Sequence, residues 1–202
     1  MDKLIIGLTG LIGSGKSLVA QILQNHGAFI IDTDKIAHEL TQSGGYFINQ
    51  LVGIFGDSIL TTTQELDRVQ LRKLVFGNDN YRAELEALLH PAIKLEVDTI
   101  LQKTMAKYII IVVPLLFKSK TYLPIINRSI FVDCPEEILI ERVMQRNKMT
   151  KIEVLQILST QPDRNIQLKL ATDIIVNDGT VDELKNKVMR LHSEYCMMLS
   201  SG

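Results

Sequence analysis

The stretch that decides the fold reads Gly10-Leu-Ile-Gly13-Ser14-Gly15-Lys16-Ser17 and matches the pattern GxxxxGK[ST] in full. Its glycines let the backbone curl, so that successive N–H groups point inward at phosphate oxygens. A helix that begins at Lys16 aims the positive end of its dipole at the same anion. We therefore expect a nucleoside triphosphate to bind here, its phosphates held by the backbone of Gly13, Ser14, Gly15, Lys16, Ser17 and Leu18.

Two side chains of this motif have chemical roles of their own. The Lys16 ammonium reaches the β- and γ-phosphates, and the Ser17 hydroxyl is a hard oxygen ligand suited to Mg²⁺. The pattern needs a strand before it and a helix after it. The chain supplies both, because the apolar run Leu4–Thr9 stops at Gly10 and residues 17–25 read as an amphipathic helix.

The runs on either side predict the rest of the sheet. Ala28–Ile31 is a second apolar run, which completes a strand–loop–helix–strand unit within about thirty residues. Further strands are predicted at Tyr108–Val113, Ile130–Val132 and Asp173–Val176. The sum is an α/β fold: a five-stranded parallel sheet with helices on both faces, in three layers, as in P-loop NTPases.

The segment between the second and third strands is helical. Its apolar spacing predicts several helices over residues 34–104, with Asp67 as a cap and a break at His90-Pro91, since proline disfavours helix in the residue before it. A connection of about seventy residues far exceeds an ordinary crossover. We expect an inserted helical subdomain.

Asp32-Thr33-Asp34 follows the second strand. Ligands of open parallel sheets sit at the carboxyl ends of the strands. Residues two apart in a strand-like segment point the same way. One carboxylate is expected on Mg²⁺ or its waters and the other as the base toward an acceptor hydroxyl. Asp32 is a candidate metal ligand, and the spacing alone leaves open which of the two is the base. The alternative makes Asp34 only the N-cap of a helix over Lys35–Thr41.

The segment after the fourth strand is basic. Arg142 and Arg146 lie four residues apart, hence on one helical face, and Arg164 follows. A basic hairpin over the phosphates would clamp them and exclude water, which a kinase needs in order not to hydrolyse ATP. The alternative is a solvated helix face. Capping boxes at Thr150–Glu153 and Thr180–Glu183 mark two of the later helix starts.

Composition excludes several classes. The 202 residues carry a net charge of −1, which argues against a dedicated duplex-binding protein. Two cysteines without CxxC spacing indicate a reducing compartment and no structural zinc. No signal peptide or membrane segment is recognised. We expect a cytoplasmic protein with no nucleic-acid or membrane partner, as a monomer or weak homo-oligomer.

Two classes of P-loop protein fit poorly. A GTPase would need a guanine-reading NKxD after a late strand, but Thr150 replaces the carboxylate in Asn147-Lys-Met-Thr150. A motor-type ATPase would end an apolar strand in an acid, whereas Ile109–Val113 runs into Pro114.

An ordered set of stretches resembles the dephospho-coenzyme A kinase family, from about Leu4 to Leu199. The matching stretches are Ile6–Ser17, Ile30–Ala37, Leu66-Asp-Arg68, Leu88-Leu-His-Pro91, Val113–Phe117, Gln145-Arg146, Gln161 and Ala171–Ile175 with Asn177 and Gly179. Three departures from the family pattern are Leu11 for glycine, Leu18 for threonine and Lys118 for glutamate. None of them removes Lys16, Ser17 or Asp34.

The resemblance implies a kinase in three parts. The P-loop core would comprise about 1–33, 106–135 and 172–202, a coenzyme A subdomain about 34–105, and a lid about 136–171. ATP, with Mg²⁺, would phosphorylate the ribose 3′-hydroxyl of dephospho-coenzyme A in the last step of coenzyme A synthesis. Asp34 corresponds to the base, Arg142 to the catalytic lid arginine with Arg146 next, and His90 lies on the substrate side. A kinase for another small acceptor and a nucleotide-dependent binding switch are the alternatives.

Overall fold

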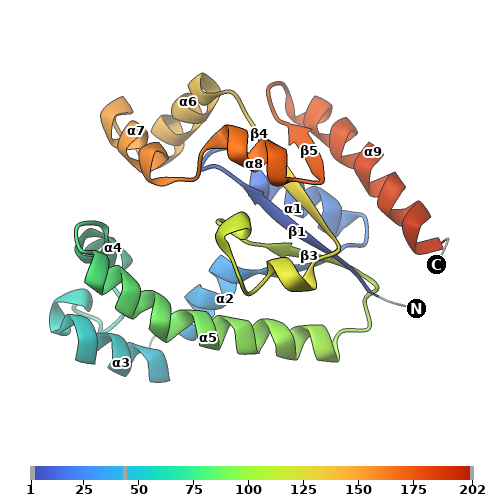
Figure 1. Ribbon diagram of the computed structural model, residues 1–202. Coiled ribbons are helices and arrows are strands. Elements are labelled where there is room, and N and C mark those ends of the chain that lie inside the picture. Colours follow the sequence, from blue (N-terminus) through green and yellow to red (C-terminus); the bar gives the residue numbers. More distant parts are fainter. Residues whose placement is uncertain (1–2, 43–44, 201–202) are drawn as a thin grey trace. The chain divides into compact units, whose positions relative to one another are not determined.

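Five strands form one sheet in the computed structural model, which describes residues 3–42 and 45–200 (Figure 1). The strands are β1 (Leu4–Gly10), β2 (Phe29–Asp32), β3 (Tyr108–Val112), β4 (Arg128–Asp133) and β5 (Asp173–Val176). Their order across the sheet is β2-β3-β1-β4-β5. Strand β1 pairs in parallel with β3 and β4, and β4 with β5. The predicted strands and the parallel sheet are confirmed, with bounds that differ by a residue or two.

Helices account for most of the remaining chain. They are α1 (Lys16–Asn25), α2 (Thr33–Leu40), α3 (Tyr46–Phe55), α4 (Arg68–Phe76), α5 (Asp79–Lys103), α6 (Glu136–Asn147), α7 (Lys151–Thr160), α8 (Arg164–Leu170) and α9 (Val181–Ser200), with short 3₁₀ turns at Asp57–Ile59, Leu116–Lys118 and Leu123–Ile125. Both predicted capping boxes are present, before α7 and α9. None of the helices within the described residues is long and apolar enough to cross a membrane.

Contacts divide the chain into two compact units. The first is Met1–Ile31 with Met105–Gly202, and the second is Asp32–Thr104. The first unit contains the phosphate-binding motif and most of the sheet. The second begins where β2 passes into α2 and contains helices α2 to α5, with an antiparallel bridge between Leu60 and Leu66.

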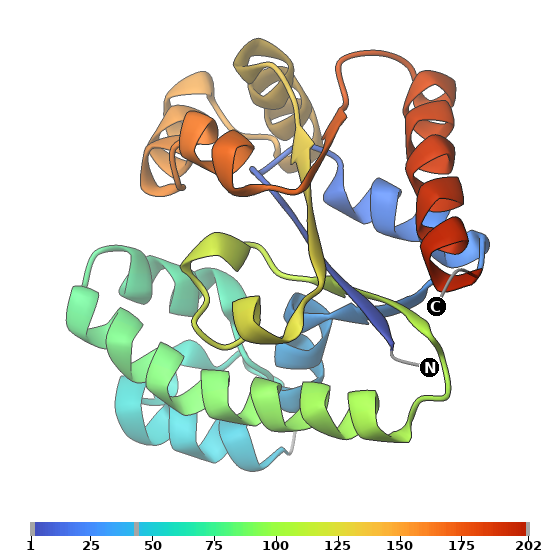
Figure 2. The ribbon, with the colours of Figure 1, turned by 45° about the vertical axis from the view of Figure 1, so that its right-hand side comes forward.

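The core of the first unit lies between the sheet and two helices, α1 and α9, which pack side by side (Figure 2). Ile6 and Leu8 of β1 alternate with Gly7 and therefore face the same side. Against them α1 buries Val19 and Leu23. These side chains of β1 and α1 pack in one core, so both ends of the loop between the two elements are held in place.

The second unit has a separate core. Leu51, Phe55, Ile59 and Leu71 are buried together, and the Phe55 ring meets the Tyr81 ring edge-on at 5.2 Å. The predicted Asp67 cap is confirmed, since its side chain accepts the N–H groups of Val69 and Gln70.

The predicted helix break at His90-Pro91 is wrong. Helix α5 runs unbroken for 25 residues with Pro91 inside it. Proline removes one backbone hydrogen bond and crowds the preceding turn, which costs about 3 kcal/mol. The two turns beyond Pro91 bury Ile93 and Val97, and burial of such side chains yields about 1.5–3 kcal/mol each. Packing beyond the proline therefore offsets the local cost.

Candidate functional site

The loop between β1 and α1, residues 11–15, is called the cradle below. Gly13 has φ of 79° and Gly15 has φ of 97°, a left-handed conformation that favours glycine. The first hydrogen bond of α1 joins Val19 N–H to the Gly15 carbonyl at 3.0 Å, and no side chain caps the helix. No acidic residue lies in its first turn. The helix therefore begins with amides and a positive dipole that neither a side-chain cap nor an acid in its first turn neutralises.

Side chains of the motif add polar groups to this cradle. Lys16 Nζ donates to the Gly10 and Leu11 carbonyls at 2.7 and 3.2 Å, which holds the ammonium at the loop. The Ser17 side chain is exposed. Ser14 Oγ is buried and has no hydrogen-bond partner among the described residues. A buried hydroxyl normally finds a partner, so this orphaned oxygen fits a loop that binds a polar ligand.

Residues from distant parts of the sequence secure the cradle. Ile12 N–H donates to Gln161 Oε1 at 2.9 Å, and Asn177 Nδ2 donates to the Ser14 carbonyl at 2.7 Å. A methyl group on Gly15 would collide with Asn177 Nδ2. The loop conformation thus depends on the linker between α7 and α8 and on the residue after β5.

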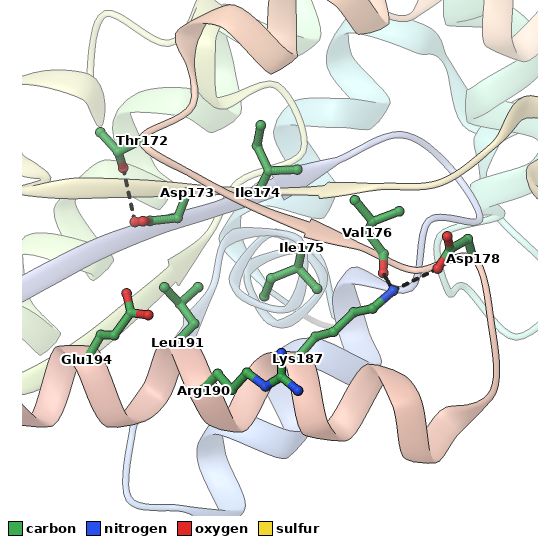
Figure 3. Close-up of a pocket in the computed structure, with 10 residues that line it drawn as sticks. All are labelled: Thr172, Asp173, Ile174, Ile175, Val176, Asp178, Lys187, Arg190, Leu191 and Glu194. Carbon is green, nitrogen blue, oxygen red and sulfur yellow. Dashed lines mark hydrogen bonds and ion pairs between the residues drawn. The ribbon is translucent and has the colours of Figure 1, made fainter.

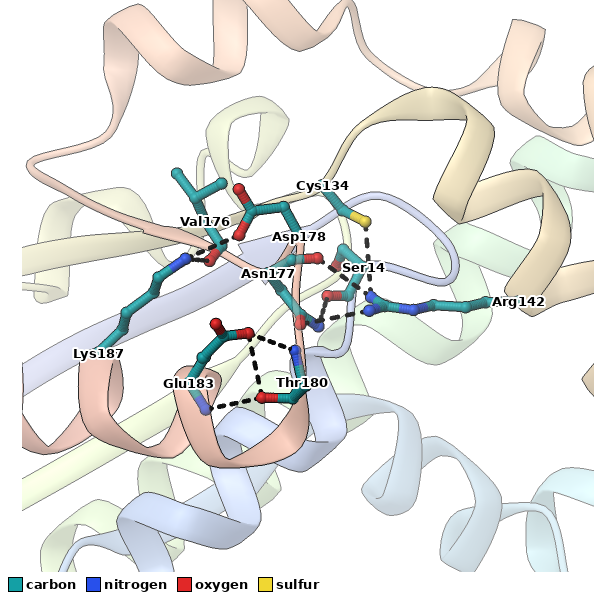
Figure 4. Close-up of polar contacts among 9 residues, drawn as sticks. All are labelled: Ser14, Cys134, Arg142, Val176, Asn177, Asp178, Thr180, Glu183 and Lys187. Atoms are coloured by element: carbon teal, nitrogen blue, oxygen red, sulfur yellow. Dashed lines mark hydrogen bonds and ion pairs between the residues drawn. The ribbon is translucent and has the colours of Figure 1, made fainter.

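Arg142 extends from α6 to the same place (Figure 4). Its Nη1 donates to Cys134 Sγ at 3.5 Å and to the Asn177 carbonyl at 3.3 Å, and its Nη2 donates to Asn177 Oδ1 at 3.4 Å. Burial raises the pKa of the Cys134 thiol, so that the sulfur is uncharged. All three acceptors are therefore neutral.

The nearby carboxylates have other partners. Asp133, which is buried at the end of β4, accepts two hydrogen bonds from Arg164, at 2.6 and 2.7 Å. Asp178 pairs with Lys187 at 2.8 Å. These two acids pair with Arg164 and Lys187, and Arg142 forms no ion pair within the described residues.

A pocket of about 210 Å³ lies next to these groups. Its lining combines loop backbone, apolar side chains and one cation: Gly13, Gly15, Leu18, Arg142, Asn177, Gly179, Val181 and Leu184. Apolar walls with one cation suit a flat base joined to phosphates. The pocket therefore joins the predicted residues Gly13, Gly15, Leu18 and Arg142 in one site.

A larger cavity, of about 630 Å³, runs along β5 and α9 (Figure 3). No residue of the phosphate-binding motif lines it. Lys187, which projects into it, already donates to the Val176 carbonyl and to Asp178, both at 2.8 Å. The smaller pocket is therefore the candidate nucleotide site.

The two carboxylates after β2 differ in their contacts. Asp32 Oδ1 accepts the N–H groups of Asp34 and Lys35 at 2.9 and 3.2 Å, so that Asp32 is the N-cap of α2. The alternative that Asp34 is the N-cap is wrong, because β2 passes into the helix at Thr33 without a loop. Asp34 lies in the first turn and is exposed. No cluster of three His, Cys, Asp or Glu side chains within residues 3–42 and 45–200 could hold a metal ion.

The remaining predicted residues lie apart from the pocket lining. Arg146 is exposed one turn after Arg142 on α6, and its Nε donates to Asn147 Oδ1 at 2.8 Å. His90 is exposed in the middle of α5. Asp34 and His90 belong to the second unit, whereas the motif and both arginines belong to the first.

Sequence reasoning assigned no role to Asp133 or Asn177. Both stand at or just after the carboxyl end of a strand, Asp133 in β4 and Asn177 after β5. Polar residues at that edge of a parallel sheet are candidates for ligand contacts. The same rule that selected Asp32 and Asp34 would have found them.

Comparisons with known proteins identify the family. The family described as dephospho-CoA kinase matches residues 4–183. A dephospho-CoA kinase from Chromobacterium violaceum is 43% identical over 191 residues, which cover 95% of this chain and 94% of that protein. One from Nitrosomonas europaea is 43% identical over 195 residues, with 96% of both chains covered.

Solved structures agree with this result. A Thermus thermophilus protein is similar with a TM-score of 0.81 and 29% identity, over 96% of this chain and 98% of that one. The dephospho-CoA kinase from Campylobacter jejuni has a TM-score of 0.68 and 28% identity, over 96% and 97%. A shikimate kinase from Acinetobacter baumannii, at 16% identity and a TM-score of 0.55, shares the fold. The chain therefore belongs to the dephospho-CoA kinase family.

Proposed function

We propose that this protein transfers the γ-phosphoryl group of ATP to the 3′-hydroxyl of the ribose of dephospho-coenzyme A, which yields coenzyme A and ADP. One observation carries the nucleotide half of the proposal. The uncapped start of α1 and the unneutralised Arg142 guanidinium present positive charge to the same pocket. Membership in the family supports the choice of acceptor.

Phosphoryl transfer depends mainly on positioning and charge neutralisation. In our proposal the 13–18 backbone and Lys16 hold the phosphates, and Arg142 neutralises charge that develops during transfer. Lys16 is already at the loop, through its bonds to the Gly10 and Leu11 carbonyls. Little reorganisation is needed before it contacts an anion.

The residues present fit a magnesium ion bound together with the nucleotide. Mg²⁺ binds few protein oxygens and keeps waters and substrate phosphates as its other ligands. Ser17, with its exposed hydroxyl at the start of α1, would hold the ion. Asp32 would contact the ion through a water molecule, with Oδ2, because Oδ1 is the atom that caps α2. When bound, the ion would neutralise charge on the β- and γ-phosphates.

We assign the acceptor to the second unit (Asp32–Thr104). Asp34 would orient the ribose hydroxyl and take its proton. Its exposed position in the first turn of α2, with the capping role filled by Asp32, supports this assignment. His90 would contact the coenzyme A portion.

We assign the role of a lid to residues 136–171, which comprise α6, α7 and α8. Six basic and two acidic residues between Arg142 and Lys169 favour phosphate contacts there. Arg146 would be the second phosphate contact after Arg142. We also propose that the protein is cytoplasmic, because Cys134 and Cys196 are free thiols. Its near-neutral charge supports the absence of a nucleic-acid partner. We propose a monomer or weak homo-oligomer.

An acceptor panel tests the proposal. ADP release from ATP would be measured with dephospho-coenzyme A, with nucleosides, with nucleotides and with no acceptor, and the product would be identified by mass spectrometry. We expect release that depends on dephospho-coenzyme A and a product with one added phosphoryl group. Release only with another acceptor, or nucleotide binding without acceptor-dependent turnover, would overturn it.

A further inference from the structure

We propose that Asn177 is a positioning residue that fixes two parts of the nucleotide site at once, the Ser14–Gly15 peptide of the phosphate loop and the guanidinium of Arg142. It lies directly after β5, and only 6% of its surface is exposed. The part of this proposal that concerns turnover rests on the proposed function. Its binding measurement needs only ATP.

The first part is the loop. Asn177 Nδ2 donates to the Ser14 carbonyl at 2.7 Å, and this bond is buried. It turns the carbonyl of the Ser14–Gly15 peptide toward β5, so that the N–H of the same planar peptide points away from Asn177. The position is tight, since a methyl group on Gly15 would meet Nδ2.

The second part is the arginine. Two of the three acceptors for Arg142 come from Asn177, namely its carbonyl and Oδ1. An amide directs the guanidinium without cancelling its charge, whereas a carboxylate would form an ion pair with it. The residue is itself anchored, because its N–H donates to the Asp133 carbonyl at 2.8 Å. Figure 4 shows the contacts of Asn177 with Ser14 and with Arg142.

Asparagine is therefore the one side chain of this size that meets both demands. Aspartate has nearly the same shape, but it cannot donate to Ser14 and would neutralise Arg142. Serine is too short for either bond and leaves the arginine charge intact. The two substitutions thus separate the loop contribution from the charge contribution.

The test measures ATP binding by calorimetry in Asn177→Ser, Asn177→Asp and the control Asn186→Asp, an exposed asparagine on α9. We expect about tenfold weaker binding for Asn177→Ser, since a buried acceptor loses its donor. For Asn177→Asp we expect about a hundredfold loss, with the added charge pair. The control should bind ATP like the unmodified protein.

A double-mutant cycle separates positioning from a general structural role. In an Arg142→Gln background, Asn177→Asp should lose no more than the tenfold attributed to the loop. Equal losses in both backgrounds, or ATP binding by Asn177→Asp within twofold of the unmodified protein, would overturn the proposal. Circular dichroism and thermal unfolding would show whether each variant folds. If Asn177→Asp does not fold, Asn177→Ser decides the loop contribution alone, and ATP binding by folded Asn177→Ser within twofold of the unmodified protein would overturn the proposal.

Turnover keeps this inference distinct from the proposed function. If the unmodified protein does not phosphorylate dephospho-coenzyme A, the proposed function fails, while the ATP-binding cycle still decides the role of Asn177. If turnover is present but the cycle shows no coupling, the positioning role fails alone.

Discussion

Helices α1 and α2 each follow a strand of the same sheet, yet their first turns are opposite in charge. Helix α1 begins after two glycines of positive φ, with no side-chain cap and no acid in its first turn. Helix α2 begins at once after β2, is capped by Asp32 and carries Asp34 in its first turn. Every α-helix has a dipole and begins with amides that have no partner within the helix, so the two helices start from the same requirement.

The difference shows how one structural feature serves two purposes. In α2 a carboxylate of the chain satisfies the amides, which stabilises the helix and closes its end to other anions. In α1 no side chain caps the first turn, and contacts from distant residues, Gln161 with Ile12 and Asn177 with Ser14, hold the loop that precedes it. The predictions below test this contrast, from the largest expected effect to the smallest.

Asp34→Asn tests whether the Asp34 carboxylate acts as the general base and does not merely stabilise α2. We expect kcat to fall about 100- to 10,000-fold, because a general base is lost, while ATP affinity and thermal stability stay unchanged. Steady-state kinetics and calorimetry measure these quantities. Glu39→Gln, the same change on the exposed side of α2, is the control. Near-normal turnover in Asp34→Asn would remove the base assignment.

Gly15→Ala tests the open end of α1. Gly27 has almost the same φ, 98° against 97°, but its added methyl group meets nothing within 4 Å. Left-handed strain alone should lower the free energy of unfolding of Gly27→Ala by about 1–2 kcal/mol. Gly15→Ala should lose about 1–3 kcal/mol more, since the methyl group disturbs the bond from Asn177 to Ser14, and should bind ATP more weakly. Equal losses in urea unfolding would show that the loop is not tightly held.

Asp32→Ala tests the closed end of α2. Loss of the cap should lower the free energy of unfolding by about 1 kcal/mol, whereas Asp32→Asn keeps a good cap and should lose little. Urea unfolding of both variants measures this. If Asp32→Asn is as unstable as Asp32→Ala, the carboxylate charge and not its hydrogen bonds stabilises the helix.

Gln161→Met tests the support that α1 receives from the linker between α7 and α8. The Ile12 amide loses its acceptor, and we expect ATP affinity to fall about fivefold, as for one partly buried hydrogen bond. Hydrogen exchange at Ile12 should speed up, with Val19 unchanged. Gln156→Met, on the exposed face of α7, is the control. Unchanged exchange at Ile12 would show that the contact carries no energy.

Local signals predicted much of this architecture. The strands were found because buried parallel strands are continuous apolar runs, and the caps at Asp67, Thr150 and Thr180 because each bonds to residues within three positions of itself. The break at Pro91 was wrong because the compensating burial of Ile93 and Val97 is a tertiary contact. The cap of α2 was placed at Asp34 as one alternative because sequence alone does not show that β2 enters the helix without a loop.

The sequence by itself determined that a nucleotide phosphate would bind between β1 and α1. A motif of glycines with one lysine and one serine can be read without long-range information, because its amides and dipole arise within a few residues. Only the tertiary structure decided which charged side chains near this motif are paired and which are not. Arg142 forms no ion pair within the described residues, whereas Arg164 and Lys187, distant in sequence, pair with Asp133 and Asp178. Which acid meets which base depends on the packing of β4, β5 and the helices that follow them, and no local pattern encodes that choice.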